Sequence, residues 1–133
     1  MKRSYSRDFS PPAPMLLVVV RLPGGSSTRH IEGKVDTGAD ICALPDSVIT
    51  DLDLPPVRTV RAAGFAGVLQ EALLFHADLE VAGRRNKHVE ALSTRRPYAI
   101  IGRNILQQFT IRLDGPKSTL TVTLPPRPKP QRG

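Results

Sequence analysis

An alternation of apolar and polar residues from Leu73 to Val81 is the feature that most constrains the fold. Successive side chains of an extended strand point to opposite faces, so this period of two predicts a strand with one buried face. The apolar positions are Phe75, Ala77, Leu79 and Val81, and the polar positions between them are His76, Asp78 and Glu80. Such a strand must pack its apolar face against other elements, so the rest of the chain has to supply a core.

Shorter segments of strand-forming residues follow one another along the chain, separated by turn residues. We expect strands over residues 15–22, 28–35 and 86–92. Clusters of Gly, Pro, Asp and Ser between such segments predict turns, and a closing hairpin is expected around residues 114–116. Its inward residues are expected to be Ile111, Leu113, Leu120, Val122 and Leu124.

Helical spacing of apolar residues is confined to residues 45–51 and 104–109, and we expect Asn104 to cap the second helix. Aromatic residues make up only 5% of the chain and Trp is absent, so Val, Leu, Ile and Ala of many short segments must form the core. The predicted fold class is therefore all-β with one or two short helices. A length of 133 residues suits one domain and is too short for two lobes with separate cores.

Proline-rich segments at residues 10–14 and 125–130 flank the predicted strands, and proline cannot donate a backbone hydrogen bond. We therefore expect a flexible N-terminal tail over residues 1–14, one domain over residues 15–124, and a Pro-rich basic tail over residues 125–133. The second tail is either a polyproline ligand for a partner or, as we favour, a solvated extension.

The formal net charge of +7 is concentrated in these flanking segments. Residues 15–124 carry 13 basic and 11 acidic groups, which is an ordinary balance for a solvated surface. We therefore do not expect the folded part to bind nucleic acid. A nucleic-acid binder that acts through its basic tails is an alternative, and its affinity would fall steeply with salt.

Membrane insertion and metal binding are not expected from this sequence. The strongest apolar run, Met15 to Val20, is far below the ~20 residues that span a bilayer, and no signal cleavage site follows it. Cys42 is the only cysteine and has no base near it in sequence, so it is expected to be a small core residue. The three histidines are far apart in sequence and are expected at the surface. We expect a cytoplasmic protein without metal or cofactor.

A carboxylate follows directly after the strand predicted over residues 28–35, in the segment Asp36-Thr37-Gly38-Ala39. Gly38 allows backbone or substrate to approach closely, and Thr37 can fix the loop by hydrogen bonds to nearby backbone. An Asp in such a loop is suited to acid/base chemistry. The competing interpretation of these residues alone is an ordinary turn with an Asx hydrogen bond.

A second segment, Ile100-Ile101-Gly102-Arg103-Asn104, changes the interpretation of the first. Together, the Asp-Thr-Gly-Ala loop after an apolar strand and the later apolar run ending in Gly-Arg-Asn resemble the retropepsin-like aspartic proteases. The resemblance covers about residues 15–124. It implies a retropepsin-like acid protease barrel with one lobe per chain and a peptide or protein substrate.

The resemblance also implies roles for the residues of the first loop. Asp36 would be the catalytic residue. Thr37 would join the two active-site loops across a dimer axis. Gly38 would also present its carbonyl to substrate, and Ala39 and Asp40 would lie in the substrate-binding surface.

Gly102 and Arg103 would be structural supports of this loop, with Arg103 paired to Asp40 beneath it. A guanidinium suits that role because it can bind a carboxylate with two hydrogen bonds. The alternative for Arg103, a surface residue at a helix start, is disfavoured because a helix N-terminus repels a cation.

Residues 57–74 are expected to form a flap, a hairpin that folds over substrate. The small residues around Gly64, Phe65 and Ala66 suit a mobile tip that binds substrate. Phe65 either contacts substrate or fills the underside of the flap.

Peptide hydrolysis by carboxylates needs one acid and one base, yet the chain has one Asp-Thr-Gly. A two-fold symmetric homodimer would bring Asp36 of each chain to the axis, where two adjacent carboxylates share one proton. The alternative is a retropepsin-fold binding or dimerisation module without proteolysis.

Overall fold

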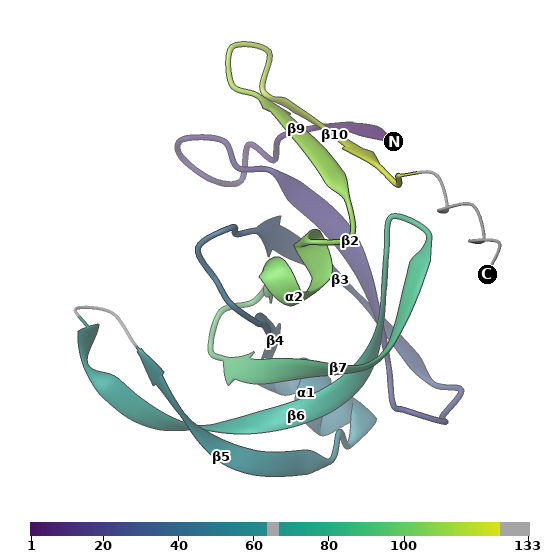
Figure 1. Cartoon of the computed structure of the whole chain (residues 1–133), viewed down its shortest axis with the longest axis vertical. Helices are drawn as coiled ribbons and strands as arrows, with labels where there is room; N and C mark the ends of the chain where they lie inside the picture. Colours follow the sequence, from purple (N-terminus) through teal and green to yellow (C-terminus); the bar gives the residue numbers. More distant parts are fainter. Residues whose placement is uncertain (64–66, 126–133) are drawn as a thin grey trace, which may run out of the picture.

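The computed structural model describes residues 1–63 and 67–125, whose elements are almost all strands. In chain order they are β1 (Lys2–Ser4), β2 (Met15–Arg21), β3 (Thr28–Val35), β4 (Cys42–Pro45), α1 (Asp46–Leu52), β5 (Pro56–Ala63), β6 (Leu69–Val81), β7 (Arg84–Thr94), β8 (Ala99–Ile101), α2 (Arg103–Leu106), β9 (Thr110–Asp114) and β10 (Thr119–Thr123). The predicted all-β class with two short helices is confirmed (Figure 1).

Six strands close into a barrel in the order β2-β3-β8-β4-β7-β6, because β6 also pairs with β2. The β3–β8 and β4–β7 pairs are parallel, and the other pairs in the barrel are antiparallel. β5 pairs with the far end of β6, and the two strands form a long hairpin that extends beyond the barrel (Figure 1).

The alternation that predicts β6 is confirmed by its burial. Each of the four apolar positions from Phe75 to Val81 is less than 9% exposed, whereas the polar residues between them are partly exposed. These side chains meet Leu16, Val18 and Val20 of β2 in the core. Cys42 is 2% exposed in the same core, as the sequence predicts.

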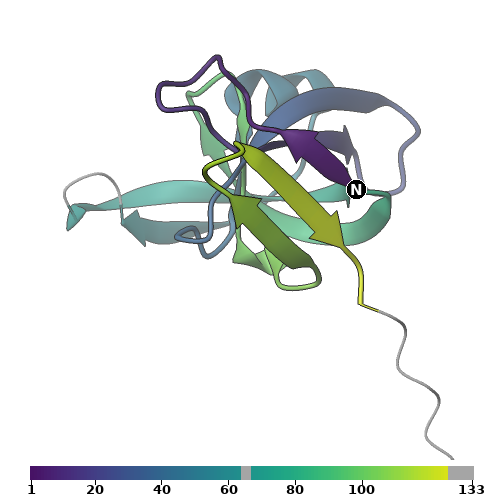
Figure 2. The same ribbon diagram turned by 90° about the horizontal axis from the view of Figure 1, so that it is seen from above.

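Residues 1–14 do not form the flexible tail that their prolines predict. β1 pairs with β10 in a second sheet of order β1-β10-β9, and Ser6 and Ala13 form a further bridge across a loop (Figure 2). The two prolines that follow Ser10 lie in that loop, where they need to donate no hydrogen bond. A strand of three residues is too short for a visible period, and its partner is at the other end of the sequence. The tail proposed for residues 126–133 lies outside the described residues.

Both helices lie close to their predicted positions, but Asn104 does not cap the second one. Gly102 is the N-cap residue of α2, and no side chain caps it. The Asn104 side chain turns instead towards β4 and β7. None of the helices in the part of the chain that the structure describes is long and apolar enough to cross a membrane.

Candidate active site

Asp36 begins the loop of residues 36–41, which connects β3 to β4 across the end of β8. Its backbone N–H donates to the Ile101 carbonyl at 3.1 Å, which fastens the start of the loop to β8. Its carboxylate oxygen Oδ1 accepts the Gly38 N–H at 2.9 Å. The side chain is therefore held at the surface by its own loop while the residue remains partly exposed. The local geometry is that of an Asx turn, so geometry alone does not separate a catalytic carboxylate from a turn residue.

Thr37 and Gly38 lie at the exposed tip of this loop, and Asp40 is exposed beside them. A Cβ on Gly38 would lie 3.2 Å from Asp36 Oδ1, tighter than ordinary contact. Glycine therefore lets the Asp36 carboxylate approach the backbone closely.

Arg103, at the start of α2, holds the same loop from below. Its Nη1 donates to the Thr37 carbonyl at 2.7 Å, and its Nη2 forms an ion pair with Asp40. The Arg103 backbone N–H also donates to the Ala39 carbonyl at 2.8 Å. The predicted Asp40–Arg103 ion pair is thus present, and Arg103 also binds the loop through the Thr37 and Ala39 carbonyls.

The Asp40–Arg103 pair is not buried beneath the loop, contrary to expectation. The Asp40 side chain is 83% exposed and that of Arg103 is 51% exposed. The short loop places Asp40 at the rim, where water screens the charges and the pair stabilises the fold only slightly.

Arg103→Lys is therefore expected to lower the free energy of unfolding by about 1 kcal/mol or less, as measured by urea denaturation. The arrangement of the loop should change more than stability, because one ammonium cannot hold both the Thr37 carbonyl and Asp40 in the same positions. A loss of stability well above that value would show that the pair is buried in solution.

Gly102 brings the two segments of the site into contact. A Cβ at this position would lie 2.5 Å from the Ile41 carbonyl carbon and 2.6 Å from its oxygen, closer than atoms can approach. Its N–H donates to the Cys42 sulfur at 3.4 Å. Glycine is thus required here by close approach of two backbones.

Asn104 connects three parts of the site in a way that the sequence does not reveal. Its Oδ1 accepts the Cys42 N–H at 3.1 Å, and its Nδ2 donates to the Glu90 carbonyl at 2.9 Å. The Cys42 thiol also donates to Oδ1, at 3.2 Å. The amide therefore ties β4 and β7 to α2. The available signal is a polar residue among the apolar positions of a short helix, and the same pattern also fits a helix cap.

Replacing Asn104 with Ala is expected to leave the Cys42 N–H and the Glu90 carbonyl without these partners. Since Cys42 is buried, the loss should lower the free energy of unfolding by about 2 kcal/mol, measured by urea denaturation. Gln107→Ala is a matched control, because that exposed side chain lies in the same turn of chain and should change stability by less than about 0.5 kcal/mol. Equal effects of the two substitutions would contradict a structural role for Asn104.

Cys42 has the properties of a core residue. Burial raises the pKa of its thiol to about 11, and the Gly102 N–H only partly offsets this. The sulfur is therefore protonated at neutral pH, which does not suit a nucleophile.

Two of the three histidines meet in space although they are distant in sequence. The rings of His76 on β6 and His88 on β7 are 5.9 Å apart and nearly perpendicular. His88 and His30 are exposed, and His76 is partly exposed. Within residues 1–63 and 67–125, no group of three His, Cys, Asp or Glu side chains is arranged to hold a metal ion.

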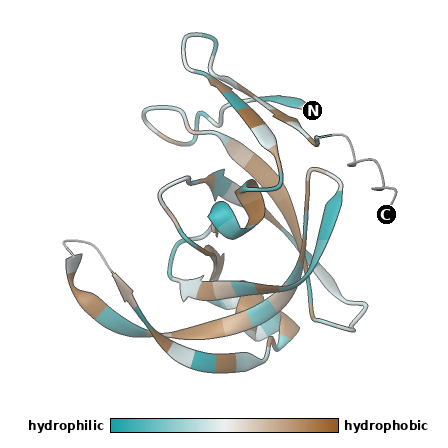
Figure 3. Cartoon of the chain, in the orientation of Figure 1, coloured by the Kyte–Doolittle hydropathy of each residue, from teal (hydrophilic) through white to brown (hydrophobic). Residues whose placement is uncertain are grey.

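The described residues of the segment predicted to be a flap, 57–63 and 67–74, lie in the β5–β6 hairpin, in which Ala63 pairs with Leu69 near the end. Gly64, Phe65 and Ala66, the predicted substrate-contacting residues, lie outside the described residues. The hairpin carries exposed apolar side chains: Val68 is 57% exposed and Leu69 62%. Hydrophobic and hydrophilic segments alternate along its strands (Figure 3). In two perpendicular views the hairpin and the loop of residues 36–41 project from the same side of the barrel (Figures 1 and 2).

Comparison with known proteins identifies the class to which this fold and loop belong. The sequence model of the retroviral aspartyl protease family matches residues 12–114, so the chain belongs to that family. Its fold is similar to that of a retropepsin-like aspartic protease from Rickettsia conorii, with 19% identity, a TM-score of 0.64, and coverage of 92% of this chain and 88% of that one.

Viral proteases show the same fold similarity. EIAV protease in complex with the inhibitor HBY-793 matches with 24% identity and a TM-score of 0.52, over 79% of this chain and 92% of that one. The solution structure of simian foamy virus (mac) protease matches with 18% identity and a TM-score of 0.53, over 71% and 92% of the two chains. The predicted retropepsin-like fold is confirmed.

Proposed function

We propose that this chain is an aspartic endopeptidase whose active unit is a homodimer, with one Asp36 contributed by each subunit. The observation that carries the proposal is the position of Asp36 in a retropepsin-like fold. Its carboxylate is fixed by the Gly38 N–H, its loop is held by Arg103, and the loop faces the same side as the β5–β6 hairpin. This combination exceeds what an isolated Asx turn requires.

The chemistry needs two carboxylates in different protonation states. One Asp36 carboxylate removes a proton from water, whose oxygen attacks the carbonyl carbon of the peptide bond, while the other, protonated Asp36 gives its proton to the carbonyl oxygen. As the C–N bond breaks, the first Asp36 gives the proton that it took from water to the leaving nitrogen. The second Asp36 regains its proton from a hydroxyl of the intermediate, which leaves an acid and an amine. Two like charges in close proximity disfavour double ionisation, so the shared proton is available for this cycle.

The exposed loop tip supports a two-fold dimer. Thr37 and Gly38 are exposed next to Asp36, so nothing in the described part of the same chain covers the surface that a second loop would meet. An isologous interface repeats each contact, which suits a site that needs the same residue twice. The second sheet also has open edges at β1 and β9, and Leu113 on β9 is 48% exposed.

An extended peptide is the proposed substrate. Gly38, Ala39 and Asp40 would contact it from the loop of residues 36–41, and Gly64, Phe65 and Ala66 remain predicted substrate contacts. An extended chain can pair with backbone groups at the loop and at the hairpin.

A binding or dimerisation module with the same fold is the rival function. It has no chemical need for a carboxylate at position 36, whereas a protease does. Incubation of the protein with a mixed peptide library at several pH values, beside Asp36→Asn, separates the two. Cleavage by the unmodified protein alone supports the protease, and cleavage by neither supports the module.

Activity should rise more steeply than linearly with enzyme concentration in the dilute range, since each site needs two chains. Initial rates over a dilution series, read beside sedimentation velocity at the same concentrations, measure this. Initial rates that rise linearly with enzyme concentration, together with a monomer in sedimentation velocity, would contradict a site shared by two chains.

A further inference from the structure

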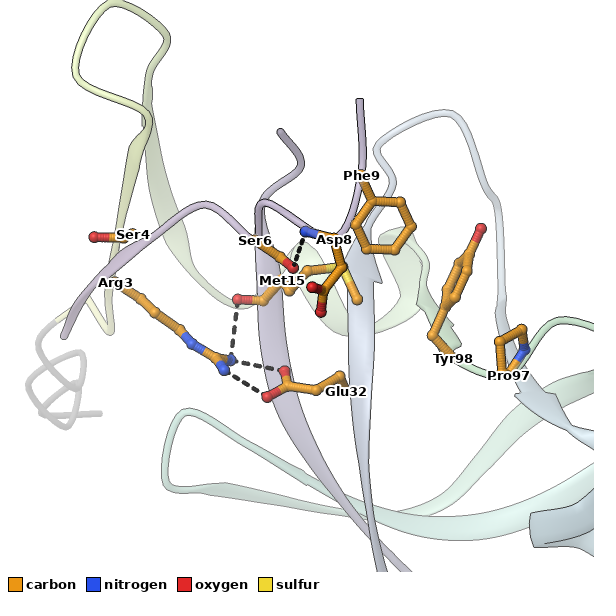
Figure 4. A pocket seen from close by; sticks show the side chains of 9 residues that line it. All are labelled: Arg3, Ser4, Ser6, Asp8, Phe9, Met15, Glu32, Pro97 and Tyr98. Atoms are coloured by element: carbon orange, nitrogen blue, oxygen red, sulfur yellow. Dashed lines mark hydrogen bonds and ion pairs between the residues drawn. The ribbon is translucent and has the colours of Figure 1, made fainter. Parts of the chain in front are cut away.

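A cavity of about 490 Å³ lies between the N-terminal loop, residues 5–13, and the loop that precedes β8 (Figure 4). Phe9 of the first loop and Tyr98 of the second join them, with ring centroids 5.1 Å apart in an edge-to-face arrangement. Pro97 and the buried Met15 complete the apolar lining. The cavity therefore has walls suited to the carbon atoms of a side chain.

The polar side of the cavity carries a net negative charge. The Arg3 guanidinium bonds both Glu32 oxygens, at 2.8 and 2.5 Å, and the Met15 carbonyl at 3.2 Å, so its charge is compensated. Asp8 forms no ion pair with any other described residue. Among the lining residues, Arg3 contributes +1 and Asp8 and Glu32 contribute −1 each, which gives −1.

Two cations of the chain lie near this cavity but are not part of its lining. Lys34 lies over the Phe9 ring at 5.1 Å, and Arg96 over the Tyr98 ring at 5.9 Å. Each is placed on a ring face, and neither forms an ion pair with Asp8. The Asp8 carboxylate thus remains open to a cation from outside. In the view of Figure 4 it lies between the Arg3–Glu32 pair and Phe9.

The cavity is within reach of a peptide bound at Asp36. Glu32 precedes Asp36 by four positions on the same extended segment, a distance of roughly 13 Å at about 3.3 Å per residue. The N-terminal loop, the loop of residues 36–41 and the β5–β6 hairpin project from the same side of the barrel in two perpendicular views (Figures 1 and 2). An extended peptide covers that distance in about four residues.

We propose that this cavity binds a Lys or Arg side chain of the substrate, about four residues from the scissile bond. The inference rests on the proteolytic function proposed above. The aliphatic stem lies against Phe9 and Tyr98, and the cationic head meets Asp8. In a two-fold dimer the cavity occurs on either side of the scissile bond. A substrate Glu would face the unpaired Asp8 carboxylate, since Glu32 is already paired with Arg3, and a Leu would leave Asp8 without a partner.

A set of peptides that differ only in Arg, Leu or Glu, four residues from the cleaved bond, tests the proposal. We expect kcat/KM to be about fivefold higher for Arg than for Leu, the upper size of an ion pair at an exposed carboxylate such as Asp8, and lowest for Glu. In Asp8→Asn the Arg-to-Leu ratio should fall close to one. Asp53→Asn, a matched change at the end of α1 outside the cavity, should keep the ratio.

Binding is measured without catalysis by titrating the Asp36→Asn protein with fluorescently labelled forms of the same peptides and recording fluorescence anisotropy. The Arg peptide should bind about fivefold more tightly than the Leu peptide, and Asp8→Asn should remove the difference. Equal binding of Arg, Leu and Glu peptides, or a preference that survives Asp8→Asn, overturns the proposed subsite. A preference for Arg without any cleavage overturns the proteolytic function and leaves the subsite standing.

Discussion

Asp36→Asn should reduce kcat/KM for peptide cleavage by at least about 10⁴-fold while the protein remains folded, because an amide of nearly the same size cannot act as base. The Gly38 N–H can still donate to the side-chain oxygen of Asn, so the loop should keep its geometry. Cleavage of a fluorogenic peptide, with circular dichroism and sedimentation on the same samples, measures both properties.

Asp53→Asn is the matched control for this substitution. Asp53 has a positive φ of 51°, a conformation that Asn also adopts readily, so neither folding nor cleavage should change. If the Asp36 variant keeps wild-type activity in a preparation free of contaminating protease, the chemistry resides elsewhere and the shared carboxylate pair is wrong.

Gly102→Ala should lower the free energy of unfolding by about 3 kcal/mol or more, a large share of the 5–15 kcal/mol typical of a domain. The new methyl group would meet the Ile41 backbone, which cannot rotate away as a side chain can. The loop of residues 36–41 must then move, so cleavage should be lost as well. Urea denaturation and the peptide assay measure the two effects.

Two other glycines make this prediction specific. An alanine at Gly115 would meet no atom within 4 Å, so Gly115→Ala should change stability by less than about 0.5 kcal/mol. An alanine at Gly33 would meet side-chain atoms of Ile101 and Val18 at 2.8–2.9 Å, and these can shift in part. An intermediate loss is expected there. If Gly102→Ala is as stable as Gly115→Ala, the backbone of residue 102 does not lie against that of Ile41 as described.

The parts of the fold that follow from sequence are those in which local pattern and burial agree. β6 shows this, since its period of two is the direct result of one buried face. The loop that begins at Asp36 could be located because an apolar strand, a carboxylate and a glycine follow one another there. The pairing of this loop with Arg103 was expected only from the resemblance to a family, because nothing in the spacing of the two segments brings them together.

Contacts between short segments that are distant in the chain could not be predicted from the sequence. β1 has three residues, and only its partner β10 makes it a strand. Asn104 acts through hydrogen bonds to backbone groups of β4 and β7, and backbone groups carry no sequence signal. The exposure of the Asp40–Arg103 pair depends on the path of the loop, which residue types do not specify.

The pairing of β1 with β10 has a kinetic consequence. The Met1 nitrogen donates to the Val122 carbonyl across a separation of 121 residues, so this sheet closes a loop that contains all six barrel strands. The entropy cost of closing the loop must be met before the stabilising hydrogen bonds between the strands can form. Strand pairs that are far apart in sequence therefore slow folding. During synthesis the barrel strands can assemble while β1 still lacks its partner. The sheet of β1, β10 and β9 should therefore be the last part to acquire protection in pulsed hydrogen exchange, after the β2–β3 and β6–β7 pairs.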